Sequence, residues 1–190
     1  MSQGLWLTCL AAMAMAAPLG AQQSRITAEM TEFSFTLNGQ QVTIARNGAA
    51  CPPACLQPLQ AVSGVATIGE LEVLDFLDLF VSAGNGLLID TRRPEAFAAG
   101  SVPGAINVPA QTLSPENPYR DDLLNELRGR QADFSGAFDL VFFADGPDAP
   151  EAVEALRDLA EAGYPTAKMK YYRGGLTVWT ALGLDTTATP

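Results

Sequence analysis

The chain has 190 residues, enough for one well-buried core and a small appendage but crowded for two full domains. It carries 21 acidic against 11 basic residues, a formal net charge of −10, and no run of Lys or Arg that could follow a phosphate backbone. It contains no histidine, which excludes histidine general bases, Ser-His-Asp triads and histidine metal ligands. Nucleic acid is therefore not expected as a partner, and neither hydrolase nor zinc chemistry of the usual kind is expected.

The N-terminus has the pattern of a secretory signal peptide. Residues 5–18 are apolar but too short to span a bilayer comfortably, and small Ala21 precedes polar Gln22. No Lys or Arg precedes Trp6, so an uncleaved N-terminal anchor is the alternative. We predict that residues 1–21 are removed, that the mature chain is periplasmic, and that no membrane contact remains after cleavage.

Residues 22–64 are predicted to form an appendage. From 32 to 46 apolar and polar residues alternate on both sides of Asn38-Gly39, a pair that supplies the positive φ angles of a tight hairpin turn. The following CPPAC segment at 51–55 contains two prolines, which lack an amide hydrogen and favour a stiff, non-helical connection. We therefore expect a β-hairpin followed by an irregular linker.

Cys51 and Cys55 are the only cysteines beyond the signal peptide. In an oxidising compartment such a pair is more often a disulfide than two free thiols, and a disulfide is the interpretation we favour. The loop is so short that the bridge would contribute only about 2 kcal/mol, which leaves room for thiol redox or sulfur relay. A third alternative is Cu(I), because C-x-x-x-C is similar to the copper loop of exported Sco-type chaperones, with Met30 or Met169 as a further soft ligand. We predict no cofactor and no metal site.

A helix is expected from about Gly69 to Ser82. Thr67 and Glu70 have the spacing of a capping box, in which the hydroxyl caps the first amides and the carboxylate reaches back. Apolar residues recur at helical spacing along it. Those expected to face the core are Leu71, Leu74, Leu77 and Phe80.

Short apolar strands then alternate with helices, which predicts an α/β fold with a doubly wound, mostly parallel sheet. The expected strands are 86–90, a brief strand within 102–109, 138–143 and about 167–172. The expected helices begin near Pro94 and stop at Gly100, run over 121–130 and 150–162, and end with a terminal helix that contains Trp179.

Spaced motifs occur in a fixed order along this region. LLIDTR at 87–92, PEAF at 94–97 and GSVPGAINVP at 100–109 are followed by GYP at 163–165 and YRGGLTVW at 172–179. Together they resemble a rhodanese-like domain. The resemblance covers about residues 65–184, leaves 185–190 as a tail, and implies an active-site loop after the strand at 140–143.

In active rhodaneses this loop begins with a cysteine that becomes a persulfide. The resemblance places that position on Ala144, whose methyl group cannot attack sulfur, and Ser101 stands where many members carry histidine. A thiolate or persulfide is normally stabilised by converging amides at the N-terminus of the following helix. The corresponding loop residues here are Ala144, Asp145, Gly146, Pro147, Asp148 and Ala149.

Charge and backbone chemistry also oppose an anionic sulfur donor at this loop. Asp145, Asp148 and Glu151 would repel it, and Pro147 and Pro150 remove two amides that could have bound it. The interpretation we favour is a plain connection, with Asp148 capping the next helix and Pro150 at its first position. The alternative is an acidic pocket for a cation or a basic peptide.

Three further residues are binding candidates. Asp90 and Arg92 lie at a strand end, where open α/β sheets often bind ligands, and Arg173 follows the last strand. For Arg92 we favour an ion pair with an acidic neighbour. For three aromatic residues in or directly before the YRGGLTVW motif we favour packing over an aromatic cage. They are Tyr171, Tyr172 and Trp179.

Two classes of function follow. The first is a rhodanese-like binding or assembly module that lacks sulfurtransferase activity and meets an unidentified protein partner in the cell envelope. The second is a thiol-dependent carrier of sulfur, electrons or Cu(I) that uses Cys51 and Cys55.

Overall fold

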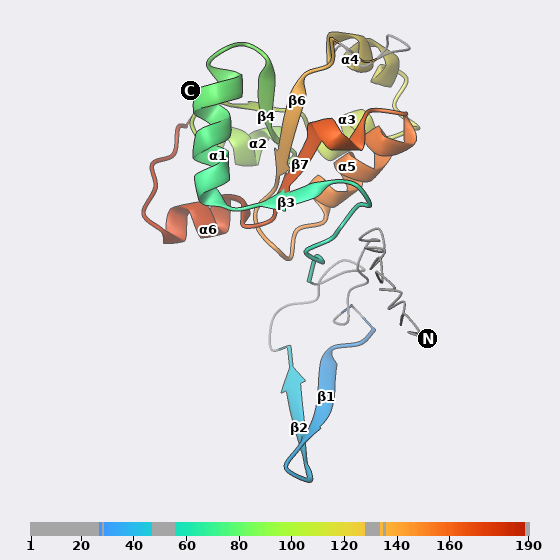
Figure 1. Ribbon diagram of the computed structural model, residues 1–190, viewed down its shortest axis with the longest axis vertical. Helices are drawn as coiled ribbons and strands as arrows, with labels where there is room; N and C mark the ends of the chain where they lie inside the picture. The colour runs from blue at the N-terminus through green and yellow to red at the C-terminus, as the bar shows by residue number, and fades with distance from the viewer. Residues whose placement is uncertain (1–26, 28, 47–55, 128–133, 135, 189–190) are drawn as a thin grey trace, which may run out of the picture.

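The computed structural model describes residues 27, 29–46, 56–127, 134 and 136–188 (Figure 1). Within this part of the chain the strands form two sheets, one of two strands and one of five. The strands are β1 (Glu32–Leu37), β2 (Gln40–Ala45), β3 (Ala66–Ile68), β4 (Gly86–Asp90), β5 (Ala105–Asn107), β6 (Asp139–Phe143) and β7 (Met169–Tyr172).

Helices alternate with the strands of the larger sheet, as expected for an α/β fold. A π-helical turn, η1 (Leu77–Val81), continues the first helix, and a 3₁₀ turn, η2 (Thr166–Lys168), precedes β7. The helices are α1 (Glu70–Phe76), α2 (Pro94–Ala99), α3 (Ala110–Leu113), α4 (Arg120–Glu126), α5 (Glu151–Glu161) and α6 (Gly175–Ala181).

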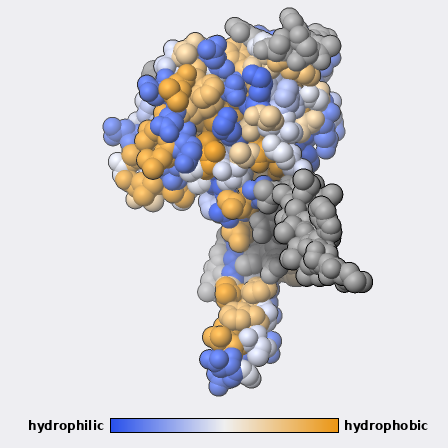
Figure 2. All heavy atoms as spheres, in the orientation of Figure 1, coloured by the Kyte–Doolittle hydropathy of each residue, from blue (hydrophilic) through white to orange (hydrophobic). Residues whose placement is uncertain are grey.

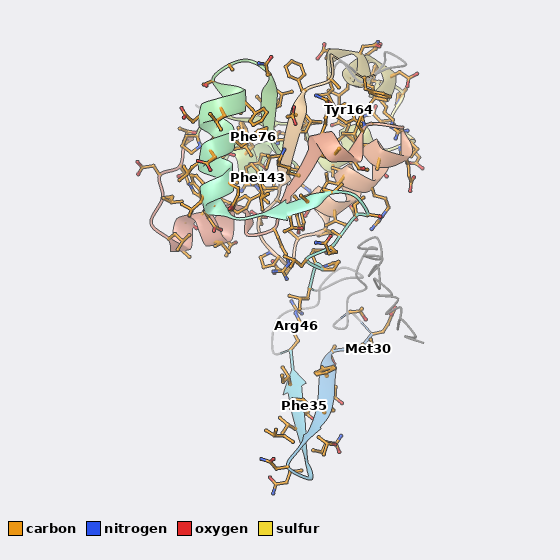
Figure 3. All side chains as sticks on the ribbon, viewed as in Figure 1. Met30, Phe35, Arg46, Phe76, Phe143 and Tyr164 are labelled. Carbon is orange, nitrogen blue, oxygen red and sulfur yellow. The ribbon has the colours of Figure 1, made fainter. Side chains whose placement is uncertain are left out.

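The five-stranded sheet has the order β3-β7-β6-β4-β5, and all its pairings are parallel. Both of its faces are covered. Leu140 and Phe142 of β6 pack into a core with α3 and α5, whereas Val141 and Phe143 pack into a second core with α1 and α6 (Figure 3). Figure 1 shows these two helical layers on opposite sides of the strands. The doubly wound, parallel sheet predicted from the sequence is confirmed.

The expected hairpin is also confirmed. β1 and β2 pair antiparallel, with Phe33 opposite Ile44 and Phe35 opposite Val42. The turn places Asn38–Gly39 at positive φ angles of 51° and 79°. Figure 1 shows this ribbon projecting away from the larger sheet.

The predicted capping box is wrong. Thr67 lies in β3, where it pairs with Tyr171 of β7, and its hydroxyl donates to the carbonyl of Leu59. The helix begins at Glu70, close to the expected start at Gly69, with Gly69 as its N-cap, and Glu72 accepts a 3.0 Å hydrogen bond from the Gly69 amide. Thr67 cannot cap the helix because it pairs with a strand that is distant in the sequence, and a local sequence pattern does not reveal such pairing.

The sequence analysis assigned the wrong residues to the buried face in the first part of this helix. Val73 and Phe76 are buried, while Leu71 and Leu74 are 72% and 42% exposed. Leu77 and Phe80 pack against the core as predicted. Both sides of the helix are apolar, so the sequence period alone could not select the buried one.

Smaller differences concern boundaries. Strand β3 and helix α3 were not predicted, and the expected strand over 167–172 begins only at Met169, after η2. Pro150 is the N-cap of α5 and not its first helical residue. The signal peptide and the Cys51–Cys55 pair lie outside the described residues. No described helix has the length and hydropathy needed to span a bilayer.

Candidate functional site

The candidate site lies where β4, β6 and β7 end. Because these strands are parallel neighbours, their carboxyl ends meet at one edge of the sheet. Asp90 closes β4, Ala144 follows β6, and Arg173 follows β7. The residues singled out in the sequence therefore come from three strand ends at this edge.

Asp90 and Arg92 form a buried ion pair at the end of β4. The Asp90 carboxylate accepts hydrogen bonds from the Arg92 amide at 3.0 Å, from Nε at 3.0 Å and from Nη2 at 2.7 Å. Asp90 has no exposed surface and Arg92 is 5% exposed. The ion pair expected for Arg92 is present, and it is buried.

Arg92 also reaches the loop that follows β6. Its Nη1 lies 3.1 Å from Asp145 Oδ1. Burial alone would lower the pKa of Arg92, but hydrogen bonds and charges from Asp90 and then Asp145 outweigh it, so the pKa is raised above its ordinary value. The trio of two carboxylates and one guanidinium carries a net charge of about −1 at neutral pH.

Two polar side chains hold this ion pair in place. Ser101 donates a 2.7 Å hydrogen bond to Asp90 Oδ2, and its backbone pairs with Thr187 near the end of the chain. Asn107 Nδ2 donates to the carbonyls of both Asp90 and Arg92 at 2.9 Å. At the position where the sequence resemblance implies a histidine in many members, this chain thus has a hydroxyl that fixes the carboxylate.

The N-terminus of α6 fixes the start of the loop. The amides of Leu176 and Thr177 donate to the carbonyls of Ala144 and Asp145 at 3.1 and 2.7 Å. Gly175 has a φ of +59°, and a Cβ there would lie 2.4 Å from the Ala144 carbonyl oxygen, so only glycine fits. Ala144 itself is 3% exposed and packs in the core beside α5.

Three positions in and beside the loop cannot offer an amide to an anion. The Ala149 amide donates to the Gly146 carbonyl at 3.1 Å, and Pro147 and Pro150 have no amide hydrogen. The predicted capping of α5 by Asp148 is wrong, because no side chain caps this helix. The turn from Gly146 to Ala149 places Pro150 at the cap position instead.

A strap formed by residues 56–65 covers part of the loop. The Gln57 amide donates a 2.7 Å hydrogen bond to the Pro147 carbonyl, and Arg173 Nε donates to the Gln57 carbonyl at 2.8 Å. Gln57 is 3% exposed, and Ala61 and Val65 of the strap belong to the core. Arg173 is thereby joined to the strap, not to Asp90. No local sequence signal indicated this contact, since its partners lie far apart in the chain.

The three aromatic residues in or directly before the YRGGLTVW motif are packed as predicted. Tyr171, Tyr172 and Trp179 are all buried. The Tyr172 and Trp179 rings meet edge to face with centroids 6.5 Å apart, and the Tyr172 hydroxyl donates to Glu70 at 3.0 Å. Burial, then the bonded Glu70, raises the pKa of Tyr172 well above its ordinary value, so it stays neutral.

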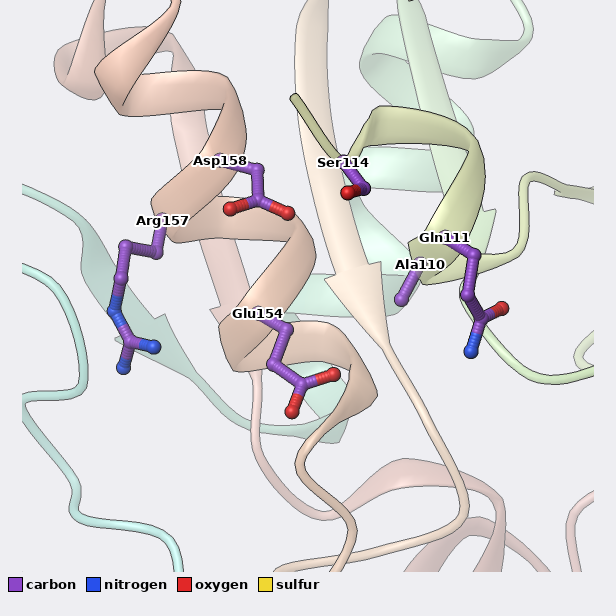
Figure 4. A pocket seen from close by; sticks show the side chains of 6 residues that line it. All are labelled: Ala110, Gln111, Ser114, Glu154, Arg157 and Asp158. Atoms are coloured by element: carbon purple, nitrogen blue, oxygen red, sulfur yellow. The ribbon is translucent and has the colours of Figure 1, made fainter. Parts of the chain in front are cut away.

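A separate hollow of about 200 Å³ lies between α3 and α5 (Figure 4). Glu154 and Asp158 of α5 face Ser114 and Gln111 across it. Burial, before any charge effect, raises the pKa of both carboxyl groups. Within the described residues no group of three Cys, Asp or Glu side chains is arranged to hold a metal ion.

The family model of the rhodanese-like domain matches residues 74–182, which include the Asp90–Arg92 ion pair, the loop after β6 and Arg173 but not the strap. The chain belongs to the rhodanese-like domain family. The solved structure of the BH2092 protein from Bacillus halodurans has the same fold, with a TM-score of 0.50 and 18% identity, over 65% of this chain and 77% of that one.

Curated relatives share the domain but are longer proteins. An HTH-type transcriptional regulator of Mycobacterium tuberculosis is 31% identical over 54% of this rhodanese-like chain and 38% of its own length. A tRNA 2-selenouridine synthase of Bordetella bronchiseptica is 34% identical over 54% of this chain and 26% of its own length. The chain thus spans well under half of each relative.

Proposed function

We propose that this rhodanese-like chain is an envelope protein that binds a protein partner and does not transfer sulfur. The observation that carries the proposal is Ala144, which stands directly after β6 where the family resemblance places the nucleophilic cysteine. Its methyl group offers no lone pair to a sulfane sulfur, and its surface is nearly closed to solvent.

Electrostatics at the loop supports the same proposal. Arg92 is the cation bonded to the loop, and its charge is already balanced by Asp90 and Asp145. The first two amides after Gly175 are bonded to loop carbonyls and are not free for an anion. An anionic donor such as thiosulfate would therefore meet net negative charge, and these α6 amides would not offset it.

The test is a sulfur-transfer assay on the mature chain with thiosulfate and cyanide. We expect no turnover above the uncatalysed rate. Turnover that persists in the Cys51→Ser/Cys55→Ser variant would overturn the proposal, because the described site would then have a chemistry of its own. Turnover that disappears in that variant would overturn it in favour of the thiol-dependent alternative.

Export is part of the proposal and has its own test. The apolar stretch at 5–18 and the small residue Ala21 support cleavage before Gln22 and a periplasmic location. Mass spectrometry of the protein from the envelope of its native cells should find a chain that begins near Gln22. An intact chain in the cytoplasmic fraction would contradict export.

One observation favours the thiol-dependent alternative as a second candidate. Gln57 is hydrogen-bonded to the loop through Pro147, and only two peptide units, about 7 Å at full extension, join Gln57 to Cys55. The Cys55 thiol, directly before the strap, would therefore be tethered within reach of the loop that lacks a cysteine. In this function the Cys55 thiolate would attack a sulfane sulfur and displace the rest of the donor, which forms a persulfide, and Cys51 would then attack the Cys55 sulfur, which forms a disulfide and releases sulfide.

A disulfide-trapping experiment tests this second candidate. In Ala144→Cys/Cys51→Ser, the new thiol and Cys55 are the two thiols of the mature chain. Intramolecular disulfide formation faster than in Ala149→Cys/Cys51→Ser would support a thiol held at the loop. Equal rates in the two variants would contradict it.

A further inference from the structure

The helical segment formed by α1 and η1 has an apolar face on each side. The inner face contributes Val73 and Phe76 to the core, and Phe80 stacks on Phe76 with ring centroids 5.2 Å apart. The outer face carries Leu71, Leu74 and Leu79, which are 72%, 42% and 64% exposed. A surface helix normally directs its large apolar residues to one side, whereas these outer leucines belong to neither core.

The π-helical turn contributes to this arrangement. The amide of Ser82 donates to the carbonyl of Leu77 at 3.0 Å, five residues back, so the turn holds one residue more than an α-helical turn. Leu77 and Phe80 pack against the core from this turn, and Leu79 points outward. The outer leucines thus stay exposed although the core contacts of the segment are complete.

Carboxylates are interleaved with these leucines. Glu72, Asp75 and Asp78 are exposed, and no Lys or Arg occurs between residues 70 and 81. In the part of the chain that the structure describes, neither Asp75 nor Asp78 has a Lys or Arg nitrogen within ion-pair distance. Figure 2 shows hydrophobic and hydrophilic residues side by side over this region.

The nearby cation Lys170 does not neutralise this face. Its ammonium lies 5.6 Å from the ring centroids of Phe76 and Phe80, on the inner side, and 3.7 Å from an oxygen of Asp139. The outer face therefore combines exposed leucines with an uncompensated negative charge.

We propose that the outer face of α1 and η1 is a docking surface for a basic amphipathic helix of a partner protein. Leucine-like residues of that helix would cover Leu71, Leu74 and Leu79, and its Lys or Arg residues would pair with Asp75 and Asp78. The negative charge of this face favours a partner helix that carries positive charge. A second copy would bring two acidic faces together, and the β1–β2 hairpin of another copy carries no cation in its strands.

This docking surface specifies the kind of partner for the proposed function, and it rests on that function because it treats the domain as a binding module. Its test is a fluorescence titration of the mature chain with a labelled 18-residue Leu/Lys peptide whose leucines follow helical spacing. A scrambled peptide of the same composition is the comparison. We expect tighter binding of the amphipathic peptide, with an affinity that falls as salt rises.

Two variants and two matched controls locate the binding. Leu71→Gln/Leu74→Gln should weaken binding about tenfold or more, because both leucines lose apolar contact. Asp75→Asn/Asp78→Asn should weaken it and flatten its salt dependence. The controls are Leu182→Gln and Glu95→Gln/Glu126→Gln, which change exposed residues outside the segment. The affinity of each control for the peptide should differ from that of the wild type by less than about twofold.

Three outcomes would overturn the proposal. Equal affinity for the scrambled peptide would mean that only charge is recognised, and equal weakening in the controls would mean that binding is spread over the acidic surface. A wild-type dimer that Leu71→Gln/Leu74→Gln converts to a monomer would assign the face to a second copy. Sulfur-transfer activity would contradict the proposed function but not this surface, so the two failures are distinguishable.

Discussion

Arg92 reaches back two residues along the chain and holds the Asp90 carboxylate through both Nε and Nη2, at 3.0 and 2.7 Å. The same guanidinium donates to the Gly100 carbonyl at 2.7 Å and to Asp145 at 3.1 Å. One side chain therefore joins the end of β4, the end of α2 and the loop after β6. Its contribution in this structure is to hold the site together.

Arg92→Met should lower the free energy of unfolding by about 3–5 kcal/mol, because it leaves the Asp90 carboxylate buried without its cation. Denaturant unfolding with a circular-dichroism signal measures this difference. Arg93→Met is the matched control, since Arg93 is the exposed neighbour of Arg92 and should change stability by less than about 0.5 kcal/mol. Equal losses in the two variants would mean that the ion pair contributes no more than a surface charge.

This ion pair shows what the sequence could and could not predict. Asp90 and Arg92 are close in the chain, so a local pattern was enough to expect their contact. The parallel sheet followed likewise from apolar strands that alternate with helices. The strap contact between Gln57 and Pro147 joins distant segments and left no local signal. The prediction of Thr67 as a helix cap was wrong for the same reason, because β7, the strand with which Thr67 pairs, lies about 100 residues later in the chain.

Gly175→Ala should destabilise the fold and displace the loop after β6. Alanine at a φ of +59° costs about 1–2 kcal/mol by itself, and its Cβ would also lie 2.4 Å from the Ala144 carbonyl oxygen. Gly183→Ala is the matched control, because Gly183 has a φ of +74° but no atom within 4 Å of the added Cβ. The difference between the two unfolding free energies isolates the clash.

Backbone amide exchange in Gly175→Ala locates the effect within the fold. The amides of Leu176 and Thr177 should lose protection, because the loop carbonyls that accept from them must move. Losses of equal size in Gly175→Ala and Gly183→Ala, with unchanged exchange at these amides, would show that the close approach of Gly175 to the loop does not matter.

Glu154→Gln should raise the stability at about pH 7 and leave it nearly unchanged at about pH 4. Burial, then the charge of Glu151, raises the folded-state pKa of Glu154, so its ionised form is less favourable in the folded than in the unfolded chain. Stability is therefore lost as the pH rises through the unfolded pKa toward the raised one. Because the side chain is partly exposed, we expect a gain below about 1 kcal/mol.

Thermal unfolding at the two pH values measures this effect. Glu95→Gln serves as the control, since Glu95 is an exposed carboxylate in the first turn of α2. A gain at low pH equal to the gain at neutral pH would indicate better packing in the hollow between α3 and α5 rather than the removal of an unfavourable charge.

Ala144→Cys should by itself yield a poor sulfur-transfer enzyme. The new thiol would occupy a position that is 3% exposed, and burial raises a thiol pKa, whereas the N-terminus of α5 lowers it. Asp145 and Asp148 would each oppose the thiolate by about 1 kcal/mol at the effective dielectric near a protein surface. Together these effects offset the favourable helix dipole, which contributes about 0.3–1 kcal/mol.

Removal of the loop charges should therefore do more than the new thiol alone. Asp145→Asn has a double effect, because it removes a carboxylate and also releases the Arg92 Nη1 that now bonds to it, 3.1 Å away. In Ala144→Cys/Asp145→Asn/Asp148→Asn this cation can act on the thiolate and on an anionic donor. We expect a lower thiol pKa and faster sulfur transfer in the triple variant than in the single one.

The comparison is made in a Cys51→Ser/Cys55→Ser background, so that only the new thiol reacts. Alkylation rates over a pH series give the thiol pKa, and thiosulfate and cyanide at low salt give sulfur transfer. Ala144→Cys/Glu95→Gln/Glu126→Gln carries the same net charge as the triple variant but keeps the loop carboxylates, so it should behave like the single variant. If the single variant already matches the triple one, the loop charges have no effect on this chemistry, and the absent sulfur atom alone accounts for an inactive site.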